Sequence, residues 1–432
     1  MRKMNRLIDG MGLVAGLMGA LVTQAADWPQ YLGPNQDDKT SEKIASTWPA
    51  GGPRVVWKAP TTDGFSILAV SGGKAFTLMS RDVEGAEREV CVAFDANTGK
   101  EVWAVPLGIA KYDGGGDTPA RDHATGGDGP RSTPTIDGGR VYALDGHLVL
   151  SCLDAAAGKT LWQKDLVKEL GAKVVQWQNA ASPVLDGDLI YLCCGAPDQS
   201  LLGLNKMDGS VAWKGESDPM THASPVVATI LGVRQVIFFT QKGLVSAEAK
   251  TGKVLWRYPF RYSVSTAASP VVSGDIVYCS AGYGVGSGAA KIAKNGDDFT
   301  ATELWRVSGN KLANHWSTPI VKDGYLYGLF GFKEFGKCPL MCLELATGKP
   351  VWSQEGFGPG GVILVDNLLL VLGDRGQLVL VDPTPNGYKE LARTQQELGK
   401  CWNHPVFSGG RIYARGTQQG VCLEAAPTTA AH

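Results

Sequence analysis

The chain has 432 residues, of which 44% are hydrophobic and 19% charged, and it contains 56 glycines and 23 prolines. This composition is typical of a globular protein made of short strands and tight turns. The formal net charge of −1 provides no broad positive field, so composition argues against nucleic acid or an anionic membrane surface as a partner.

The first 26 residues have the organisation of a secretory signal peptide. Three basic residues within the first six precede an apolar run, Met11–Val22, and small residues follow, with cleavage expected after Ala25 or Ala26. The run is short for a bilayer span, and no cysteine for lipid attachment lies near the expected cut. We therefore expect a periplasmic or secreted protein without a stable membrane anchor, with an uncleaved anchor as the alternative.

Two incomplete strand units stand at the ends of the remaining chain. Residues 27–53 read as an extended arm lying on the folded body, because their aromatic residues need apolar surface to cover. Residues 54–60 have the form of an outermost strand without its three partners, whereas residues 401–424 supply three strands and then stop, before a tail at 426–432. We expect these two fragments to pair and close one repeat unit.

Between the ends, one pattern recurs with a period near fifty residues. Each copy has a Ser/Thr-Pro-Val strand, a Gly-Val-Tyr strand and then Leu-Asp-Ala-x-Thr-Gly-Lys-x-x-Trp, clearest at 93–103. Short strands repeated at such a period are typical of a β-propeller. The count predicts an all-β fold with eight four-stranded antiparallel blades over residues 54–425; seven blades remain open because the seventh unit, near residues 361–391, is weak.

Each repeat ends in a tryptophan that we expect to fill the gap between neighbouring blades. The role predicted for these side chains is structural docking: Trp57, Trp103, Trp162, Trp213, Trp256, Trp305 and Trp352. The glycine of the Thr-Gly turn is expected to adopt a positive φ.

Polar and aromatic residues precede the innermost strands, where the blades converge on the axis. Aligning the units on their proline gives a candidate ligand- or cofactor-binding set at the channel mouth: Arg131, Gln178, Asn179, His222, Asn314, His315, Trp316, Trp402, Asn403 and His404. The histidines come from separate units, and no spacing assigns a metal site. The insertion at 108–130 is expected over the same face, as a solvated loop, a lid or a partner contact. No motif for nucleophilic catalysis occurs, so no catalytic residue is assigned.

The repeats resemble the pyrroloquinoline-quinone (PQQ) repeat superfamily, whose docking motif is Ala-x-Asp-x-x-Thr-Gly-x-x-x-Trp, over about residues 54–425. One branch, the quinoprotein alcohol dehydrogenases, binds PQQ and calcium in an eight-bladed propeller. Another, the barrel-assembly propeller lipoprotein of the outer membrane, is a scaffold without cofactor. The resemblance therefore implies either a binding scaffold or a quinone-dependent enzyme.

This sequence departs from both branches. The calcium ligands and the Asp base of the dehydrogenases cannot be placed, although Cys193-Cys194 is similar to the adjacent-cysteine disulfide beside their quinone; two free thiols are the alternative. The lipidated cysteine of the scaffold branch is missing. We expect a monomeric exported scaffold without cofactor or enzymatic activity, which binds an envelope protein or a small polar ligand. The alternative is an oxidoreductase that uses PQQ with Ca²⁺ on alcohols or sugars.

Overall fold

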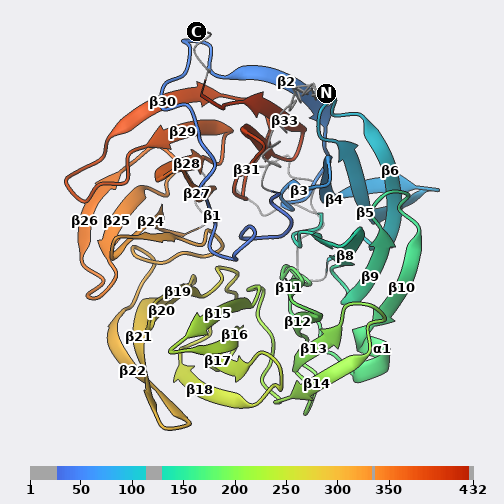
Figure 1. Ribbon diagram of the computed structural model, residues 1–432, viewed down its shortest axis with the longest axis vertical. Helices are drawn as coiled ribbons and strands as arrows, with labels where there is room; N and C mark the ends of the chain where they lie inside the picture. Colours follow the sequence, from blue (N-terminus) through green and yellow to red (C-terminus); the bar gives the residue numbers. More distant parts are fainter. Residues whose placement is uncertain (1–26, 113–128, 333–335, 428–432) are drawn as a thin grey trace, which may run out of the picture.

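The computed structural model describes residues 27–112, 129–332 and 336–427, and these form eight antiparallel sheets arranged around one axis (Figure 1). Each sheet is a blade of four strands, and the seventh carries a fifth strand. One short helix is described, α1 (Leu166–Leu170). The predicted all-β, eight-bladed propeller is confirmed, and the weak seventh unit is a complete blade.

The blades follow one another along the chain, and their strands run from the axis outward. Blades 1 to 4 are β3 (Ala69–Ser71), β4 (Lys74–Val83), β5 (Ala86–Asp95) and β6 (Glu101–Ile109); β7 (Thr135–Asp137), β8 (Arg140–Leu144), β9 (Val149–Asp154) and β10 (Thr160–Asp165); β11 (Val184–Asp186), β12 (Leu189–Cys193), β13 (Leu201–Asn205) and β14 (Val211–Gly215); and β15 (Val226–Ile230), β16 (Val233–Thr240), β17 (Gly243–Glu248) and β18 (Val254–Pro259).

Blades 5 to 8 have the same plan. They are β19 (Val271–Ser273), β20 (Ile276–Ala281), β21 (Gly286–Asn295) and β22 (Asp298–Val307); β23 (Ile320–Lys322), β24 (Tyr325–Leu329), β25 (Leu340–Glu344) and β26 (Pro350–Gln354); β27 (Gly361–Val365), β28 (Leu368–Leu372), β29 (Gln377–Val381) and β30 (Glu390–Gln395), with β1 (Lys39–Thr40) on its inner edge; and β31 (Val406–Ser408), β32 (Arg411–Arg415), β33 (Gln419–Glu424) and β2 (Arg54–Pro60). The hydrophobic core lies between the faces of neighbouring sheets.

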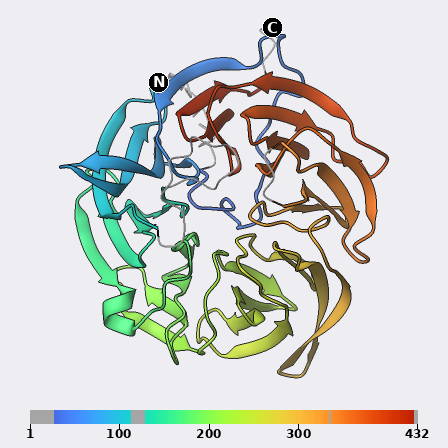
Figure 2. The same ribbon diagram turned by 180° about the vertical axis from the view of Figure 1, so that it is seen from behind.

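The two ends of the chain meet in blade 8, as the incomplete units predict. β2 pairs antiparallel with β33, from Arg54 opposite Glu424 to Pro60 opposite Gln419, so the outermost strand comes from the N-terminal side (Figure 2). Arg415 on β32 adds a second closure, because its buried guanidinium donates to the carbonyl oxygens of Thr62 and Leu78, at the start of blade 1, at 2.7 and 2.8 Å. The ring therefore has no open seam.

Five of the seven predicted docking tryptophans lie against the turn glycine of the following blade: Trp57, Trp103, Trp162, Trp213 and Trp305. Trp256 instead donates to Gln235 in its own blade, and Trp352 donates to Thr384 O. Trp213 Nε1 donates to Ala249 O at 2.9 Å, and a Cβ built on Gly252, which has φ +75°, would lie 2.5 Å from the Trp213 ring. Trp57, Trp103 and Trp305 likewise bond a carbonyl oxygen of the next blade. The turn glycine is thus required twice, for its positive φ and for the space that the indole occupies.

The Ser/Thr before the repeat's proline links neighbouring blades around the axis. Thr133 Oγ1 accepts the Ile67 N–H at 3.1 Å, and Ser182 Oγ accepts the Thr133 N–H at 2.9 Å. Ser224 accepts from Ser182 in the same way, and Thr318 accepts from Ser269. These bonds satisfy buried N–H groups that have no partner within their own sheet. We call this set the hydroxyl belt.

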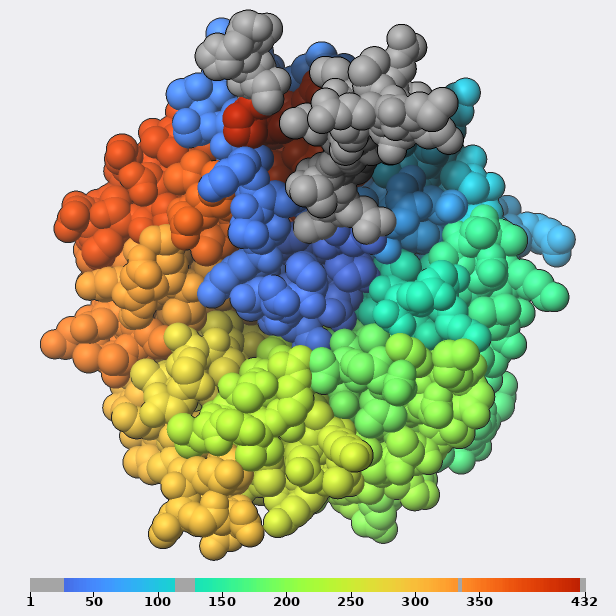
Figure 3. Space-filling view, viewed as in Figure 1, coloured from blue at the N-terminus to red at the C-terminus, as the bar shows by residue number. Residues whose placement is uncertain are grey.

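The N-terminal arm, residues 27–53, crosses one end of the ring. Trp28 is fully buried and forms an antiparallel bridge with Val70 on β3 of blade 1, and β1 pairs parallel with β27 of blade 7. In the space-filling view the arm covers the centre of this face (Figure 3). One mouth of the propeller is therefore largely occupied by the protein's own chain.

Within the described residues, no helix is long and apolar enough to cross a membrane. The expected signal peptide, residues 1–26, lies outside the part of the chain that the structure describes.

Candidate functional site

Apart from His404, which contacts the arm, the predicted residues before the innermost strands lie toward the end of the ring opposite the arm. The arm contacts positions two residues after the aligned proline, as at Ile136, whereas Trp316 and Trp402 lie three residues before it. Five residues of extended chain separate the two levels by roughly 16 Å. The second mouth is thus a distinct surface, which we call the aromatic face.

Aromatic rings from several blades form a connected cluster on the aromatic face. Trp402 of blade 8 stacks on Trp316 of blade 6, with ring centroids 4.4 Å apart. Trp402 also stacks with Phe65 of blade 1, at a centroid distance of 5.6 Å. His315 contacts both Trp316 and Tyr283, at 4.7 and 5.2 Å. The cluster therefore spans the convergence of blades that are far apart in sequence.

Trp177 and Tyr283 stand out within the cluster because of their backbone. Both have left-handed φ values, 65° and 55°, which are uncommon for bulky side chains. Their rings are stacked with an interplanar angle of 12° and a centroid distance of 6.3 Å, and both are only partly buried. Two large aromatic side chains are held at this mouth in conformations that glycine would adopt at lower cost.

Several of the predicted polar residues are fully engaged in holding the scaffold. Asn314 accepts the Tyr278 hydroxyl at 2.6 Å and donates to Leu329 O at 2.8 Å. Asn179 bonds both the carbonyl and the N–H of Ala181. Both side chains are buried. Their hydrogen-bonding capacity is directed into the protein, so these amides position the loops of the face.

The three predicted histidines do not converge. His222 Nε2 lies 2.8 Å from Gln176 O and its Nδ1 lies 3.0 Å from Ser265 Oγ, and burial lowers the pKa of His222 to about 4. His315 belongs to the aromatic cluster. His404 lies on the arm side, where its Nε2 is 3.6 Å from Asp38 Oδ1, and burial lowers its pKa to about 4. His222 and His404 are therefore neutral at neutral pH.

The remaining predicted residues lie around the axis between these groups. Arg131 donates to Trp177 O at 2.8 Å and its guanidinium lies 5.0 Å from the Tyr112 ring centroid. Gln178 and Asn403 are buried, and their side-chain carbonyl oxygens have no hydrogen-bond partner among the residues that the structure describes. Arg131 thus supports the loop of Trp177, while the two amide oxygens add acceptors near the axis.

Glu89 is a buried acid beside this face that the repeat alignment does not identify. Its carboxylate accepts the Tyr112 hydroxyl at 2.6 Å and the Gly146 N–H at 3.1 and 3.2 Å. Burial, with Asp145 nearby, raises its pKa to about 8. The sequence gives little indication that Glu89 is buried, because it lies in β5 next to several other charged residues.

The lysine beside Trp402 is a second feature outside the repeat pattern. Lys400 is buried, and its Nζ lies 3.7 Å from the centroid of the Trp402 ring, within the range of a cation–π interaction. Asp374 lies near Lys400 and accepts the Gly336 N–H at 2.6 Å; burial raises its pKa to about 6.

Cys193 and Cys194 are both free thiols in the structure, so the adjacent-cysteine disulfide is not formed there. Cys193 Sγ lies 3.5 Å from Ser200 Oγ, and Cys194 Sγ donates to Gln199 O at 3.3 Å. Both are buried, and burial raises the pKa of Cys194 to about 11. These contacts tie β12 to the turn before β13 and do not direct the thiols to a ligand.

The described residues do not fit a calcium-bound quinone. No group of three or more His, Cys, Asp or Glu side chains that could hold a metal ion occurs in the described ranges. The carboxylates near the face, Glu89 and Asp145, bond backbone N–H groups and a tyrosine. Most of the predicted 108–130 insertion, residues 113–128, lies outside the described residues.

Comparison with known proteins gives one consistent family. The family model described as outer membrane protein assembly factor BamB matches residues 86–354. The BamB protein of Shewanella oneidensis is 24% identical over 322 residues, covering 70% of this chain and 73% of that protein. The BamB protein of Yersinia pestis is 24% identical over 262 residues, covering 59% of this chain and 64% of that protein, slightly less than two thirds of its length.

Solved structures are similar in fold at low sequence identity. BamB from Moraxella catarrhalis matches with a TM-score of 0.56 and 13% identity, covering 86% of this chain and 99% of that chain. A quinohemoprotein alcohol dehydrogenase from Comamonas testosteroni matches with a TM-score of 0.61 and 14% identity, covering 94% and 81%. Both likenesses concern the propeller architecture, which hosts unrelated functions.

Proposed function

This chain belongs to the family of outer membrane protein assembly factor BamB, whose model matches residues 86–354, and we propose that it is an envelope scaffold that assists outer membrane protein assembly. In this proposal the propeller binds a protein partner through the aromatic face. It acts in the periplasm, uses no cofactor and performs no chemistry.

The observation that carries the proposal is the stacked pair of Trp177 and Tyr283. Both rings are partly exposed and are held on left-handed backbone, at a cost of roughly 1–2 kcal/mol per residue. Strained, partly exposed aromatic residues are typical of binding sites, and rigid aromatic anchors supply much of the energy of protein interfaces. Partner recognition accounts for their presence at this mouth.

The two faces of the ring also differ in a way that favours binding at this end. The opposite mouth is crossed by residues 27–53 of the same chain (Figure 3). The aromatic face instead offers a connected cluster of aromatic rings, in which Trp177 and Tyr283 are partly exposed. Tyrosine and tryptophan are enriched at protein-binding surfaces.

The test uses variants that remove the rings without adding strain. Trp177→Gly and Tyr283→Gly relieve the left-handed backbone, so the double variant is expected to fold with a melting temperature within a few degrees of the parent protein. Leu231→Gly is the matched control, because Leu231 also has a positive φ, 48°, and is exposed, but lies in the β15–β16 turn. Each protein is expressed in the host strain lacking the gene.

The readout is the amount of folded β-barrel protein in the outer membrane, measured by heat-modifiable gel mobility. The deletion is expected to lower it severalfold, the parent protein and Leu231→Gly to restore it, and the double glycine variant to fail. An unchanged barrel level on deletion would contradict the assembly role, and full rescue by the double variant would contradict the role of the aromatic face. Quinone retained after incubation with PQQ and calcium, with dye-linked alcohol oxidation, would contradict the absence of chemistry.

A further inference from the structure

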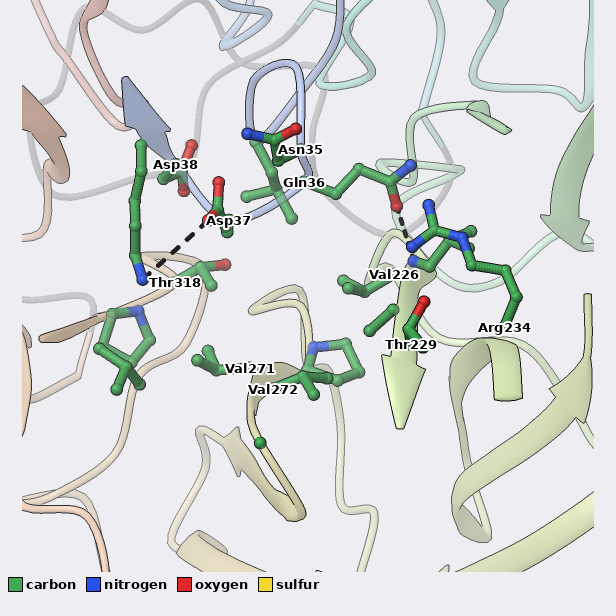
Figure 4. A pocket seen from close by; sticks show the side chains of 18 residues that line it. Asn35, Gln36, Asp37, Asp38, Val226, Thr229, Arg234, Val271, Val272 and Thr318 are labelled. Atoms are coloured by element: carbon green, nitrogen blue, oxygen red, sulfur yellow. Dashed lines mark hydrogen bonds and ion pairs between the residues drawn. The ribbon is translucent and has the colours of Figure 1, made fainter. Parts of the chain in front are cut away.

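A sector of the arm-side mouth is left open at blades 5 and 6. A cavity of about 240 Å³ lies there between the arm and the innermost strands, far larger than the ~10–15 Å³ that holds one water. Figure 4 shows Val271 and Val272 of β19 facing the arm residues Asp37 and Asp38 across this space. We call it the arm-side pocket.

In five of the other six blades, the arm accepts a hydrogen bond from one backbone N–H of the innermost strand. We call this group the axial amide; it belongs to the second residue after the aligned proline. Main-chain oxygens of the arm accept the axial amides of Val70, Ile136 and Leu364, at 2.8 Å in each case. The side-chain oxygens of Gln30 and Gln36 accept those of Leu185 and Val227, at 3.4 and 2.6 Å. All five acceptors are carbonyl oxygens.

The axial amides of blades 5 and 6 belong to Val272 and Val321. Val272 is opposite Val277 and Val321 is opposite Leu326, next to hairpins with two-residue turns, the same register as Val70 in blade 1. The pair after such a turn is hydrogen-bonded and the next pair is not, so both N–H groups point to the axis. Within the described ranges, no acceptor bonds either of them, and both valines line the arm-side pocket.

The axial amide of blade 8 differs from those of blades 5 and 6 because it does not border the cavity. It belongs to Phe407, which is fully buried, and Phe407 does not line the pocket. The axial amides at the wall of the cavity are therefore those of Val272 and Val321, in two adjacent blades. An unsatisfied N–H at the wall of a pocket is a site for a carbonyl acceptor.

The residues that line the pocket indicate which side chains and charges a bound ligand would have. Val226, Val271 and neighbouring prolines are apolar, so a small apolar side chain is favoured. The cations at the rim are each beside a carboxylate: Lys39 Nζ is 4.0 Å from Asp37 Oδ2, and Arg234 Nη2 is 2.5 Å from Asp186 Oδ1. No excess charge selects for a charged ligand.

We propose that the arm-side pocket binds an uncharged, extended peptide segment of a partner protein, whose main-chain carbonyl oxygens accept the axial amides of Val272 and Val321. The segment makes with blades 5 and 6 the same type of bond that the arm makes with five other blades: one carbonyl oxygen accepts one axial amide from each blade. This site lies opposite the aromatic face and does not depend on the role proposed for that face.

The test measures valine amides by NMR in the full-length exported protein labelled with ¹⁵N-valine, with signals assigned by Val→Ile substitution. Without ligand, the amides of Val272 and Val321 should exchange with solvent at least tenfold faster than those of Val70 and Val227, which donate to the arm. Acetyl-Val-Thr-Val-Thr-amide should then shift Val272 and Val321 downfield and leave Val70 and Val227 unchanged. The proposal would be overturned if the four amides exchanged at equal rates, or if millimolar peptide left the Val272 and Val321 signals unshifted. It would also be overturned if these signals shifted with the concentration of the protein and did not respond to the peptide.

A pair of variants at one position separates the hydrogen bond from the side chain. Val272→Pro removes the axial amide without breaking a ladder bond, since that N–H faces the pocket, whereas Val272→Ala keeps it. The proline variant should weaken peptide binding about fivefold or more relative to the alanine variant, the value of one peptide hydrogen bond, with both melting within a few degrees of the parent protein. Equal affinities of two folded variants would contradict the proposed contact.

Discussion

Replacing Gly252 by alanine tests how the tryptophans hold the blades together. An alanine Cβ at Gly252 would lie 2.5 Å from the Trp213 ring, on backbone with φ +75°. The left-handed backbone costs roughly 1–2 kcal/mol, and forcing the indole aside costs a further 1–3 kcal/mol or so. Displacing Trp213 also strains its 2.9 Å bond to Ala249 O. We therefore expect Gly252→Ala to lower the free energy of unfolding by about 2–5 kcal/mol.

Gly232→Ala is the matched control for this prediction. Gly232 has φ +82°, and a Cβ there would meet nothing within 4 Å, so this variant should lose only the ~1–2 kcal/mol of backbone strain. Urea unfolding followed by far-UV circular dichroism compares the two midpoints. In a Trp213→Leu background, the cost of Gly252→Ala should fall to that of Gly232→Ala. Equal destabilisation of the two glycine variants in the parent protein would refute the proposed docking of the indole on the turn.

Three further predictions follow from buried polar groups. Arg415→Met should lower the free energy of unfolding by about 3–5 kcal/mol, because it leaves carbonyl oxygens at the blade 8–blade 1 junction without donors. The control Arg411→Met, at a half-buried site, should cost less than ~1 kcal/mol. Similar melting temperatures of the two variants would contradict this prediction. Ser182→Ala should cost roughly 1–3 kcal/mol in urea unfolding by leaving the Thr133 N–H without an acceptor, and Ser182→Thr should restore most of it. Because the pKa of Glu89 is raised to about 8 in the folded protein, the unfolded chain loses this proton near pH 4.5 while the folded protein keeps it. The free energy of unfolding should therefore fall between about pH 4.5 and 8, by roughly 1 kcal/mol per pH unit. Glu89→Gln should flatten this pH profile, and parallel profiles of the variant and the parent protein would contradict the raised pKa.

The architecture could be predicted from the sequence because the repeat encodes contacts between neighbours. A tryptophan, a Thr-Gly turn and a proline recur at fixed offsets, and each makes the same contact in most blades. The closure was also predictable, since residues 54–60 and 401–424 each lack what the other supplies. The hydroxyl belt was not, because the Ser/Thr beside the proline also reads as an ordinary strand-initiating residue.

The candidate site was predictable in position but not in arrangement. Alignment on the proline places Trp316 and Trp402 near the axis, and the structure stacks them at 4.4 Å. It cannot reveal that Trp177 and Tyr283 adopt left-handed backbone, because φ at an irregular loop depends on contacts from other blades. His404 shows the same limit: its position matches the others in sequence, yet it lies against the arm, 3.6 Å from Asp38, since the arm follows no repeat.

The arm contacts blades 7 and 8 at a place where the hydroxyl belt is interrupted. The position that Ser or Thr occupies in blades 2 to 6 holds Ile67 in blade 1, Gly361 in blade 7 and His404 in blade 8, and a Cβ on Gly361 would lie 2.5 Å from His404. This close approach fits the imidazole beneath the arm, where it contacts the Tyr31 ring at 5.1 Å, next to the β1–β27 pairing. The arm contacts both blades here, since Asp38 O accepts the Leu364 N–H and Glu42 Oε2 accepts the Gly410 N–H. Its bonds to the axial amides pass from Val227 in blade 4 directly to Leu364 in blade 7, and this leaves the axial amides of blades 5 and 6 beside the open sector.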